Sequence, residues 1–304
     1  MKLSVFMTGG SGLLATNWSL MMRDECVFTL GLHKRSVSIS GIKTCFADLN
    51  SQKYLIDLFE KTKPDVVVHT AGLTNIEQCE ASPDLAYDVN VKLTANVAKA
   101  CKAENIKLVY ISTDHLFAGN GSLVDETQPV EPINVYAQTK ADAEKHVLKA
   151  NNENLIIRTN FYGWGTRYRL SFSDLVLQTL RDGKALKLQK NRFFTPILIY
   201  DLVSAVHELI ALNASGIYNI VGDDRISKYD FGLALAREFE LEKKLLEPGY
   251  DSYDHQIVRR PADMSLSNIK ARNLLSRNLG GVQNHLARLR DQEVFGLKNI
   301  LLNL

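Results

Sequence analysis

ISTDHLFAGNGSLVDETQPVEPINVYAQTKADAEK, residues 111–145, predicts a buried strand, a glycine loop and a helix in succession. Its first residues close an apolar, β-branched run that begins at Ile106 and is typical of a buried strand. A loop with two glycines and two prolines follows, and the predicted helix carries Tyr136 and Lys140. A spacing of four residues places these two side chains on one face of that helix.

A tyrosine beside a lysine is suited to acid catalysis. Tyrosine titrates near ~10, and a neighbouring positive charge favours its ionised form. We therefore expect Lys140 to lower the pKa of Tyr136, so that the phenol can donate a proton to a substrate oxygen at neutral pH. Thr113, at the end of the predicted strand, could supply a hydroxyl to the same oxygen. Alone, the Tyr-x-x-x-Lys pattern is also typical of a solvent-facing pair. Other motifs in the chain are needed to distinguish a catalytic pair from such a surface pair.

A glycine-rich turn lies near the start of the chain. Leu3 to Met7 predict a short apolar strand, and TGGSGLLA, residues 8–15, predicts a turn that opens a helix. Glycines let backbone N–H groups approach a pyrophosphate at a helix amino terminus, where the helix dipole favours anions. A plain turn is the alternative. We expect a dinucleotide cofactor to bind Gly9, Gly10, Ser11, Gly12, Leu13 and Leu14.

The end of the second predicted strand, residues 27–32, bears on the choice of cofactor. His33, Lys34 and Arg35 follow it, where a site for NAD usually has an acidic residue. Basic side chains suit a 2′-phosphate, so we predict NADP(H), with NADH possible; a solvated basic loop is the alternative. Further cofactor contacts are expected from residues beside the adenine and along the middle of the cofactor, namely Asp48, Leu49, Ala71, Gly72 and Leu73.

Predicted strands and helices alternate through the first half of the chain. Helices at about 52–61 and 83–104, and the helix that carries Tyr136 and Lys140, alternate with strands at 65–72, 106–112 and 155–158. This alternation predicts an α/β fold, a Rossmann-type doubly wound parallel sheet.

The segment TNFYGWGTRYR, residues 159–169, leaves that pattern. We place a boundary there, with a first domain at 1–160 and a smaller lobe at 161–304, from which about 197–222 returns to the first domain. The aromatic rings and arginines of the segment could hold a base and a diphosphate. Phe161 and Trp164 could equally be core between the two domains.

Composition excludes several classes of protein. The 304 residues are 45% apolar and 23% charged, and a net charge of +2 favours neither nucleic acid nor an anionic membrane. No apolar run reaches the ~18 residues of a membrane span. We expect no signal peptide, because MKLSVFMTGG leads straight into a predicted strand and a glycine turn. Four scattered cysteines form no C-x-x-C pair, so we expect reduced thiols and a cytoplasmic protein. The histidines show no metal-ligand spacing, so we predict no metal. An amphipathic helix at 282–295 should cover a surface, and a homodimer is possible.

Several separated motifs occur in a characteristic order along nearly the whole chain, among them MTGGSGLLA, VVVHTAGLTNIEQCE, YISTDHLFAGNG, NVYAQTKADAEK, FTPILIYDLV and RRPADMSLSN. Together they resemble the extended short-chain dehydrogenases/reductases, and within these the dTDP-4-dehydrorhamnose reductase family. The resemblance implies a Rossmann domain for a nicotinamide cofactor and a carboxyl-terminal lobe for a nucleotide-sugar. The implied activity is NADPH-dependent reduction of a nucleotide-activated 4-keto-6-deoxy sugar, in nucleotide-sugar and cell-surface polysaccharide biosynthesis.

The same resemblance implies roles for individual residues. Tyr136 would be the proton donor, Lys140 would bind the nicotinamide ribose and tune the tyrosine, and Thr113 would orient the keto oxygen. The chain departs from the family at His115, where relatives commonly carry tyrosine, and at 160–162, which leaves the sugar open. The expected substrate contacts are Thr74, Thr113, Asp114, His115, Asn160, Phe161 and Arg192.

Two other functions fit the same motifs. One is a sugar-nucleotide epimerase or dehydratase of the same fold, which would retain its cofactor tightly through turnover. The other is a binding partner without catalysis, because the regulatory β-subunit of methionine adenosyltransferase is similar in sequence to these reductases. An intact set of Thr113, Tyr136 and Lys140 favours an enzyme.

Overall fold

A seven-stranded parallel sheet forms the centre of the computed structural model, which describes residues 2–250 and 258–304. The strand order is β11-β6-β5-β4-β1-β2-β3, so six of its strands follow the 3-2-1-4-5-6 order of a doubly wound dinucleotide-binding fold. The strands are β1 (Leu3–Thr8), β2 (Cys26–Leu32), β3 (Lys43–Phe46), β4 (Val66–His69), β5 (Lys107–Ile111), β6 (Leu155–Arg158) and β11 (Gly216–Asn219).

Apolar residues fill both faces of this sheet. Successive side chains of a strand point to opposite faces, and here both sets are apolar, as parallel sheets covered on two sides require. Val5 and Met7 of β1 lie in one buried cluster, whereas Phe6 lies in the other. The same division separates Val66 and Val68 from Val67 in β4, which explains the uninterrupted apolar run in the sequence.

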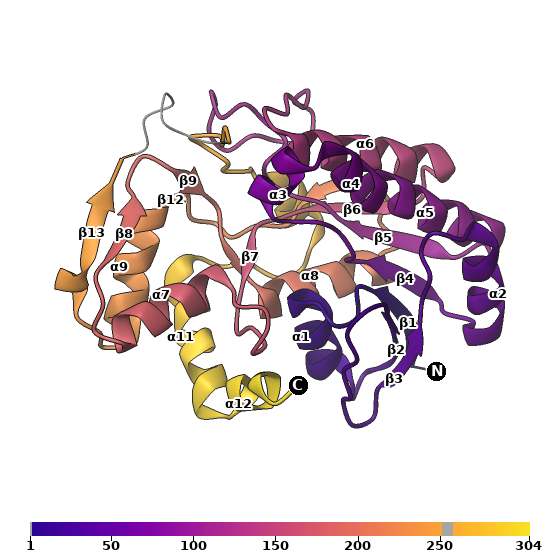
Figure 1. Ribbon diagram of the computed structural model, residues 1–304, viewed down its shortest axis with the longest axis horizontal. Coiled ribbons are helices and arrows are strands. Elements are labelled where there is room, and N and C mark those ends of the chain that lie inside the picture. The colour runs from indigo at the N-terminus through magenta and orange to yellow at the C-terminus, as the bar shows by residue number, and fades with distance from the viewer. Residues whose placement is uncertain (1, 251–257) are drawn as a thin grey trace.

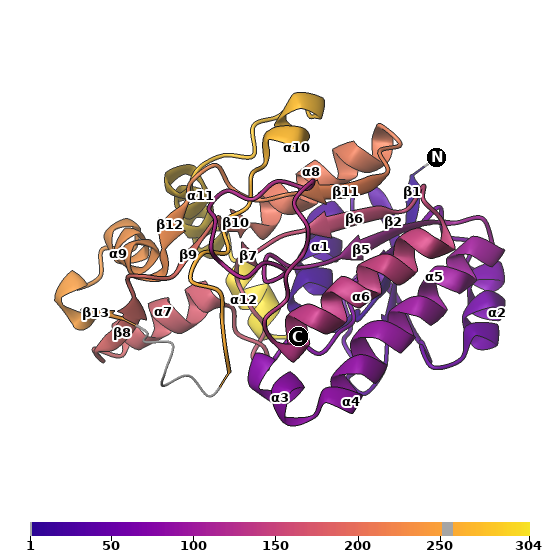
Figure 2. The same cartoon turned by 90° about the horizontal axis from the view of Figure 1, so that it is seen from above.

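Helices cover the two faces (Figures 1 and 2). Helices α1 (Leu13–Met22) and α8 (Ile199–Ala211) pack on one face, where Trp18 and Leu202 are fully buried. The other face is covered by α2 (Gln52–Thr62), α5 (Leu93–Ala103) and α6 (Val135–Ala150). The chain before α5 is helical as well, in α3 (Ile76–Ala81), α4 (Pro83–Tyr87) and a π-helical turn (Asp88–Lys92).

The smaller lobe lies beyond the carboxyl ends of the strands, on the left in Figures 1 and 2. It is built on a cluster of rings, in which Phe231 contacts Tyr162, Phe172 and Phe194 with centroids 4.9–5.9 Å apart. Its elements are β7 (Phe161–Tyr162), α7 (Phe172–Arg181), β8 (Leu186–Gln189), β9 (Phe193–Phe194), β10 (Ile197–Leu198), β12 (Ile226–Ser227), α9 (Lys228–Glu238), a short 3-10 helix (Lys243–Leu245), β13 (Leu246–Gly249), α11 (Val282–Val294) and α12 (Leu297–Leu302). Helix α10 (Ile269–Leu274) lies beside β11 of the central sheet, where Lys270 donates a hydrogen bond to the carbonyl oxygen of Ile217.

The predicted fold class is confirmed: the molecule is an α/β protein with a Rossmann-type parallel sheet and a smaller carboxyl-terminal lobe. Strand β11 pairs in parallel with β6, and so joins the sheet although it lies beyond residue 160. The division into two domains at residue 160 stays a prediction. Within the described part of the chain, no helix combines the length and the apolar character needed to cross a membrane.

Candidate active site

The glycine turn after β1 is tightly packed against its neighbours. Gly9 has a φ of +66°, and a Cβ there would lie 2.8 Å from the backbone nitrogen of Ala71. A Cβ on Gly10 would lie 2.6 Å from the Cβ of Leu30. Both positions therefore require glycine. The turn leads directly into α1, so its backbone can approach an anion at the helix amino terminus.

A cavity of 630 Å³ opens beside this turn, at the carboxyl ends of β1, β4 and β5. Strand order reverses between β1 and β4, and ligands of doubly wound sheets bind at such a point. The structure brings many residues predicted for cofactor and substrate to this cavity: Ser11, Gly12, Leu13, Leu14, Arg35, Ala71, Gly72, Leu73, Thr74, Tyr136, Lys140, Asn160 and Phe161.

Tyr136 lies in the wall of this cavity, near the start of α6. Asn134 caps the helix by accepting a hydrogen bond from the backbone N–H of Ala137, 2.8 Å away. The Tyr136 side chain is 8% exposed. Burial raises its pKa to about 12, and a hydrogen bond with Thr113 opposes part of that rise. The phenol is therefore protonated at neutral pH and can serve as a proton donor.

Lys140 lies one helical turn further on and is also buried. Its Nζ donates a hydrogen bond to the carbonyl oxygen of Ile111, 2.8 Å away, and lies 4.1 Å from the centre of the Tyr110 ring. Burial lowers its pKa to about 7, against a smaller opposite effect of Glu144. The expectation that Lys140 lowers the pKa of Tyr136 is wrong for this structure, because loss of hydration dominates at both groups.

Behind Tyr136, a buried polar network holds Thr113. The Thr113 hydroxyl donates to Asp114 over 3.3 Å, and the other Asp114 oxygen accepts a 2.5 Å bond from the Asn160 amide. The His115 ring packs edge-on against Tyr136, with centroids 5.8 Å apart, and burial lowers the pKa of His115. Asp114 and His115 thus contact the proposed catalytic side chains and do not line the cavity.

Arg192 is likewise buried, and its Nη1 donates to the carbonyl oxygen of Pro261 over 3.1 Å. It does not line the cavity beside the glycine turn. Thr113 does not line that cavity either. The predicted contacts with a substrate stay predictions for Thr113, Asp114, His115 and Arg192. Asp114 contacts Thr113 and His115 contacts Tyr136, so both are placed to support the proposed catalytic side chains.

Asn90 supports the cavity from the π-helical turn. Its side-chain oxygen accepts from the backbone N–H of Leu73 at 2.7 Å, while its amide donates to the carbonyl of Leu73 and to the Thr139 hydroxyl, each at 3.0 Å. Asn90 therefore fixes the loop after β4 against α6. π-Helical turns often occur at functional sites. The sequence offered only an asparagine in a helix, so this role was not predicted.

The segment 159–169 divides its side chains between core and cavity. Trp164 is 1% exposed, and its Nε1 donates to the carbonyl of Leu289, so it belongs to the core. Phe161 is half-buried and lines the cavity. Arg169, which was not predicted as an individual contact, also lines the cavity and donates to the Thr74 hydroxyl over 2.6 Å.

The basic residues after β2 line a second cavity, of 720 Å³, that adjoins the first. His33, Lys34 and Arg35 all line it, and their predicted contact with a 2′-phosphate stays a prediction. Asp48 and Leu49 follow β3 and line neither cavity, and the Asp48 carboxylate accepts two 3.0 Å bonds from Asn50. Their contact with the adenine stays a prediction.

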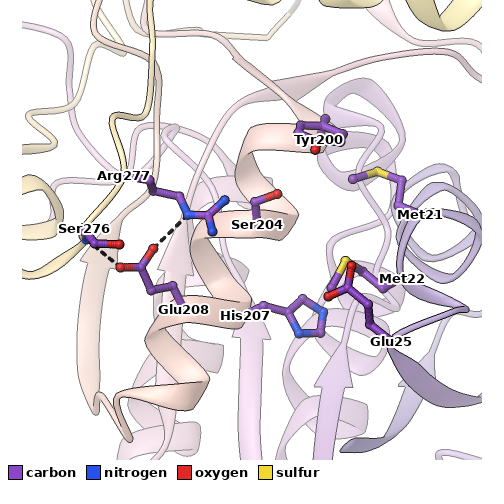
Figure 3. A pocket seen from close by; sticks show the side chains of 9 residues that line it. All are labelled: Met21, Met22, Glu25, Tyr200, Ser204, His207, Glu208, Ser276 and Arg277. Atoms are coloured by element: carbon purple, nitrogen blue, oxygen red, sulfur yellow. Dashed lines mark hydrogen bonds and ion pairs between the residues drawn. The ribbon is translucent and has the colours of Figure 1, made fainter. Parts of the chain in front are cut away.

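A third cavity, of 540 Å³, lies between α1 and α8, and no residue predicted for the site lines it (Figure 3). Several of its polar groups have partners within the protein: Glu208 binds Ser276 and Arg277, and His207 accepts a 2.8 Å bond from Trp18. Nowhere among residues 2–250 and 258–304 do three histidine, cysteine or acidic side chains gather as metal ligands would.

Comparison with known proteins gives a match over nearly the whole chain. The family model described as "RmlD substrate binding domain" matches residues 1–294. The dTDP-4-dehydrorhamnose reductase of Aggregatibacter actinomycetemcomitans is 27% identical over 232 residues, 72% of this chain and 78% of that protein. Subunit beta of methionine adenosyltransferase 2 from Mus musculus is 27% identical over 255 residues, 82% of this chain and 75% of that protein.

Among solved structures, the dTDP-4-dehydrorhamnose reductase of Bacillus anthracis, determined in complex with NADP, superposes with a TM-score of 0.85. The match covers 96% of this chain and all of that one. Because the two sequences are only 22% identical, the match supports the fold alone.

Proposed function

The chain belongs to the RmlD substrate binding domain family, and from this membership we propose that it is an NADPH-dependent reductase of a nucleotide-activated 4-keto-6-deoxy sugar. One observation carries the proposal: a buried, protonated tyrosine and a buried lysine line the same cavity as a glycine turn for a dinucleotide. The relative from Aggregatibacter actinomycetemcomitans, named for such a reduction, supports it.

The cavity suits a dinucleotide in shape and in polarity. A side chain on Gly9 would collide with Ala71 in the loop after β4, and one on Gly10 would collide with Leu30 of β2, so the turn has room only for glycine. Ser112 lines the same cavity, and its buried hydroxyl has no hydrogen-bond partner among the described residues. When bound, a nicotinamide cofactor would supply a hydride to the keto carbon.

The protein's own groups would complete the reduction. Tyr136 donates its proton to the oxygen of the former keto group, which becomes a hydroxyl. Thr113, held by Asp114, orients that oxygen, and the Lys140 ammonium binds the ribose next to the nicotinamide. The raised pKa of Tyr136 suits this direction of reaction, because a phenol that stays protonated can act as an acid.

The test is cofactor oxidation by the purified protein against a panel of nucleotide-linked 4-keto sugars, with the matching 4-hydroxy sugars as controls. We expect loss of NADPH absorbance only with 4-keto compounds, in a one-to-one ratio with reduced sugar. Absence of turnover across a panel that varies both base and sugar would contradict the proposal.

A binding role without catalysis is the second candidate, because the chain also matches the β-subunit of methionine adenosyltransferase 2 over most of its length. A protein with this binding role should bind the cofactor but reduce no sugar. An epimerase or dehydratase has less support. A dehydratase would need an extra acid near Thr113, and the Asp114 carboxylate at that place is 2% exposed and bound to Asn160.

A further inference from the structure

The second cavity is lined by residues that lie far apart in the sequence. Its basic residues come from two segments, the loop after β2, with His33, Lys34 and Arg35, and the turn after β7 that contains Arg167 and Tyr168, while Ser11 and Leu304 complete the lining. The charged side chains that line this cavity, Lys34, Arg35 and Arg167, are all basic. No acidic side chain of the described residues lines it. Such a lining favours an anion.

The turn that carries Arg167 and Tyr168 is held rigidly. Thr166 and Arg169 exchange backbone hydrogen bonds of 3.0 and 3.1 Å across it, and the Thr166 side chain is fully buried. Gly165 precedes the turn, and a Cβ there would lie 2.3 Å from the carbonyl oxygen of Arg169. The turn therefore fixes the backbone at Arg167 and Tyr168, whose side chains both line the second cavity.

Tyr168 connects this turn to both parts of the expected cofactor site. Its hydroxyl donates a 2.9 Å hydrogen bond to the carbonyl of Ser11 in the glycine turn. The Arg35 guanidinium lies 3.8 Å from the centre of its ring. A cation is attracted to the face of such a ring, so Tyr168 restricts an exposed arginine that would otherwise lose more conformational entropy on binding a ligand.

Neither guanidinium is neutralised by the protein. Across the described residues, Arg35 and Arg167 pair with no carboxylate, whereas Arg158, Arg181, Arg225 and Arg288 each have an acidic partner. Two guanidiniums without a carboxylate partner in one cavity suit a phosphate, which an arginine can bind with two parallel hydrogen bonds.

We propose that the turn after β7 completes the site for the cofactor's 2′-phosphate, with Arg167 as a second phosphate ligand opposite Arg35 and Tyr168 as a positioning residue for Arg35. The proposal rests on the proposed use of NADPH and deepens it. The arginines of segment 159–169 thereby serve different ligands: Arg167 faces the cofactor, whereas Arg169 contacts Thr74 in the first cavity.

The test uses two fragments of the cofactor, adenosine 2′,5′-bisphosphate and adenosine 5′-monophosphate, and measures their binding to the full chain by calorimetry. The wild type should prefer the bisphosphate. Arg167→Ala should weaken bisphosphate binding by about tenfold, the size of one charge-assisted contact, and leave monophosphate binding nearly unchanged. Tyr168→Leu should reduce the same preference, and Tyr168→Phe should restore most of it because the ring remains.

Arg272→Ala is the matched control, since it removes an exposed arginine whose only described ion pair, with Asp223, is long at 4.0 Å. It should keep the wild-type preference. An unchanged preference in Arg167→Ala, or a wild type that binds both fragments equally, would overturn the inference. Fragment binding needs no sugar, so a preference lost in Arg167→Ala supports the inference even if no 4-keto sugar is reduced.

Discussion

The Nζ atom of Lys140 donates a hydrogen bond to the carbonyl oxygen of Ile111, 2.8 Å away, and thereby ties helix α6 to the carboxyl end of strand β5. These two residues come from the two ends of the strand–loop–helix stretch from which the fold was predicted. The bond holds the lysine beside the Tyr110 ring, while Tyr136, one turn earlier, lies next to Thr113.

Replacing Tyr136 with phenylalanine should abolish reduction and leave cofactor affinity nearly unchanged, because only the proton-donating hydroxyl is lost. General acid catalysis contributes typically ~10²–10⁴-fold. The measurement is kcat from NADPH oxidation, with the cofactor Kd from fluorescence. Tyr87→Phe, at a 43% exposed position, is the control. A Tyr136→Phe enzyme with more than about half the wild-type kcat would remove the phenol from the mechanism, since that loss is far below this range.

The buried Lys140 should make stability depend on pH. Its folded pKa, about 7, lies below the ordinary value of 10.5. Between these values the unfolded chain binds more protons than the folded one, so the free energy of unfolding rises with pH. Relative to Lys140→Met, the wild type should gain up to about 1.4 kcal/mol per pH unit above about pH 7, and nothing below it.

Urea unfolding of both proteins across this range measures the effect, with Lys99→Met as the control at an exposed lysine. A stability difference between wild type and Lys140→Met that stays constant with pH would show that the lysine keeps its charge in the folded state.

Removing the Arg35 side chain should weaken the preference for NADPH over NADH. One charge-assisted contact to the 2′-phosphate corresponds to roughly tenfold in relative affinity. The measurement is kcat/KM for both cofactors in the wild type and in Arg35→Ala, with Arg23→Ala as a control for the loss of one exposed charge. Equal use of both cofactors by the wild type would mean that the basic residues after β2 form only a solvated loop.

Helix α11 should contribute to stability by its apolar face. Leu286 and Leu289 are 1% and 0% exposed. Leu286→Ala should lower the free energy of unfolding by about 2–5 kcal/mol, whereas Val294→Ala, at a 74% exposed position, should change it little. Truncation after Arg277 should lower stability further, because it also uncovers Trp164. A truncated protein that melts like the full chain would contradict this. A homodimer stays a prediction for analytical ultracentrifugation.

Much of the candidate site was predictable because its signals are local. The glycines at positions 9 and 10 are required by a turn of a few residues, and the four-residue spacing of Tyr136 and Lys140 alone puts both side chains on one helical face. The basic residues after β2 were predictable for the same reason, since the end of that strand is directed to one place in a doubly wound sheet.

The pKa values were not predictable, because they depend on burial. A lysine four residues from a tyrosine suggested a lowered tyrosine pKa, whereas enclosure of both groups raises the pKa of Tyr136 and lowers that of Lys140. Tyr136 and Lys140 lose their hydration because α6 packs on β5 and on the surrounding loops. The spacing of two residues along one helix contains no information about this burial.

The sequence by itself determined the α/β class, the glycine turn and the tyrosine–lysine pair, because helix and strand periods and turn requirements are properties of neighbouring residues. Only the tertiary structure decided which distant side chains meet. Tyr168 binds Ser11 across 157 residues, and Asn160 holds Asp114 across 46. Such contacts arise when the chain between them folds back on the sheet, so their geometry belongs to the packed molecule and is absent from any local pattern.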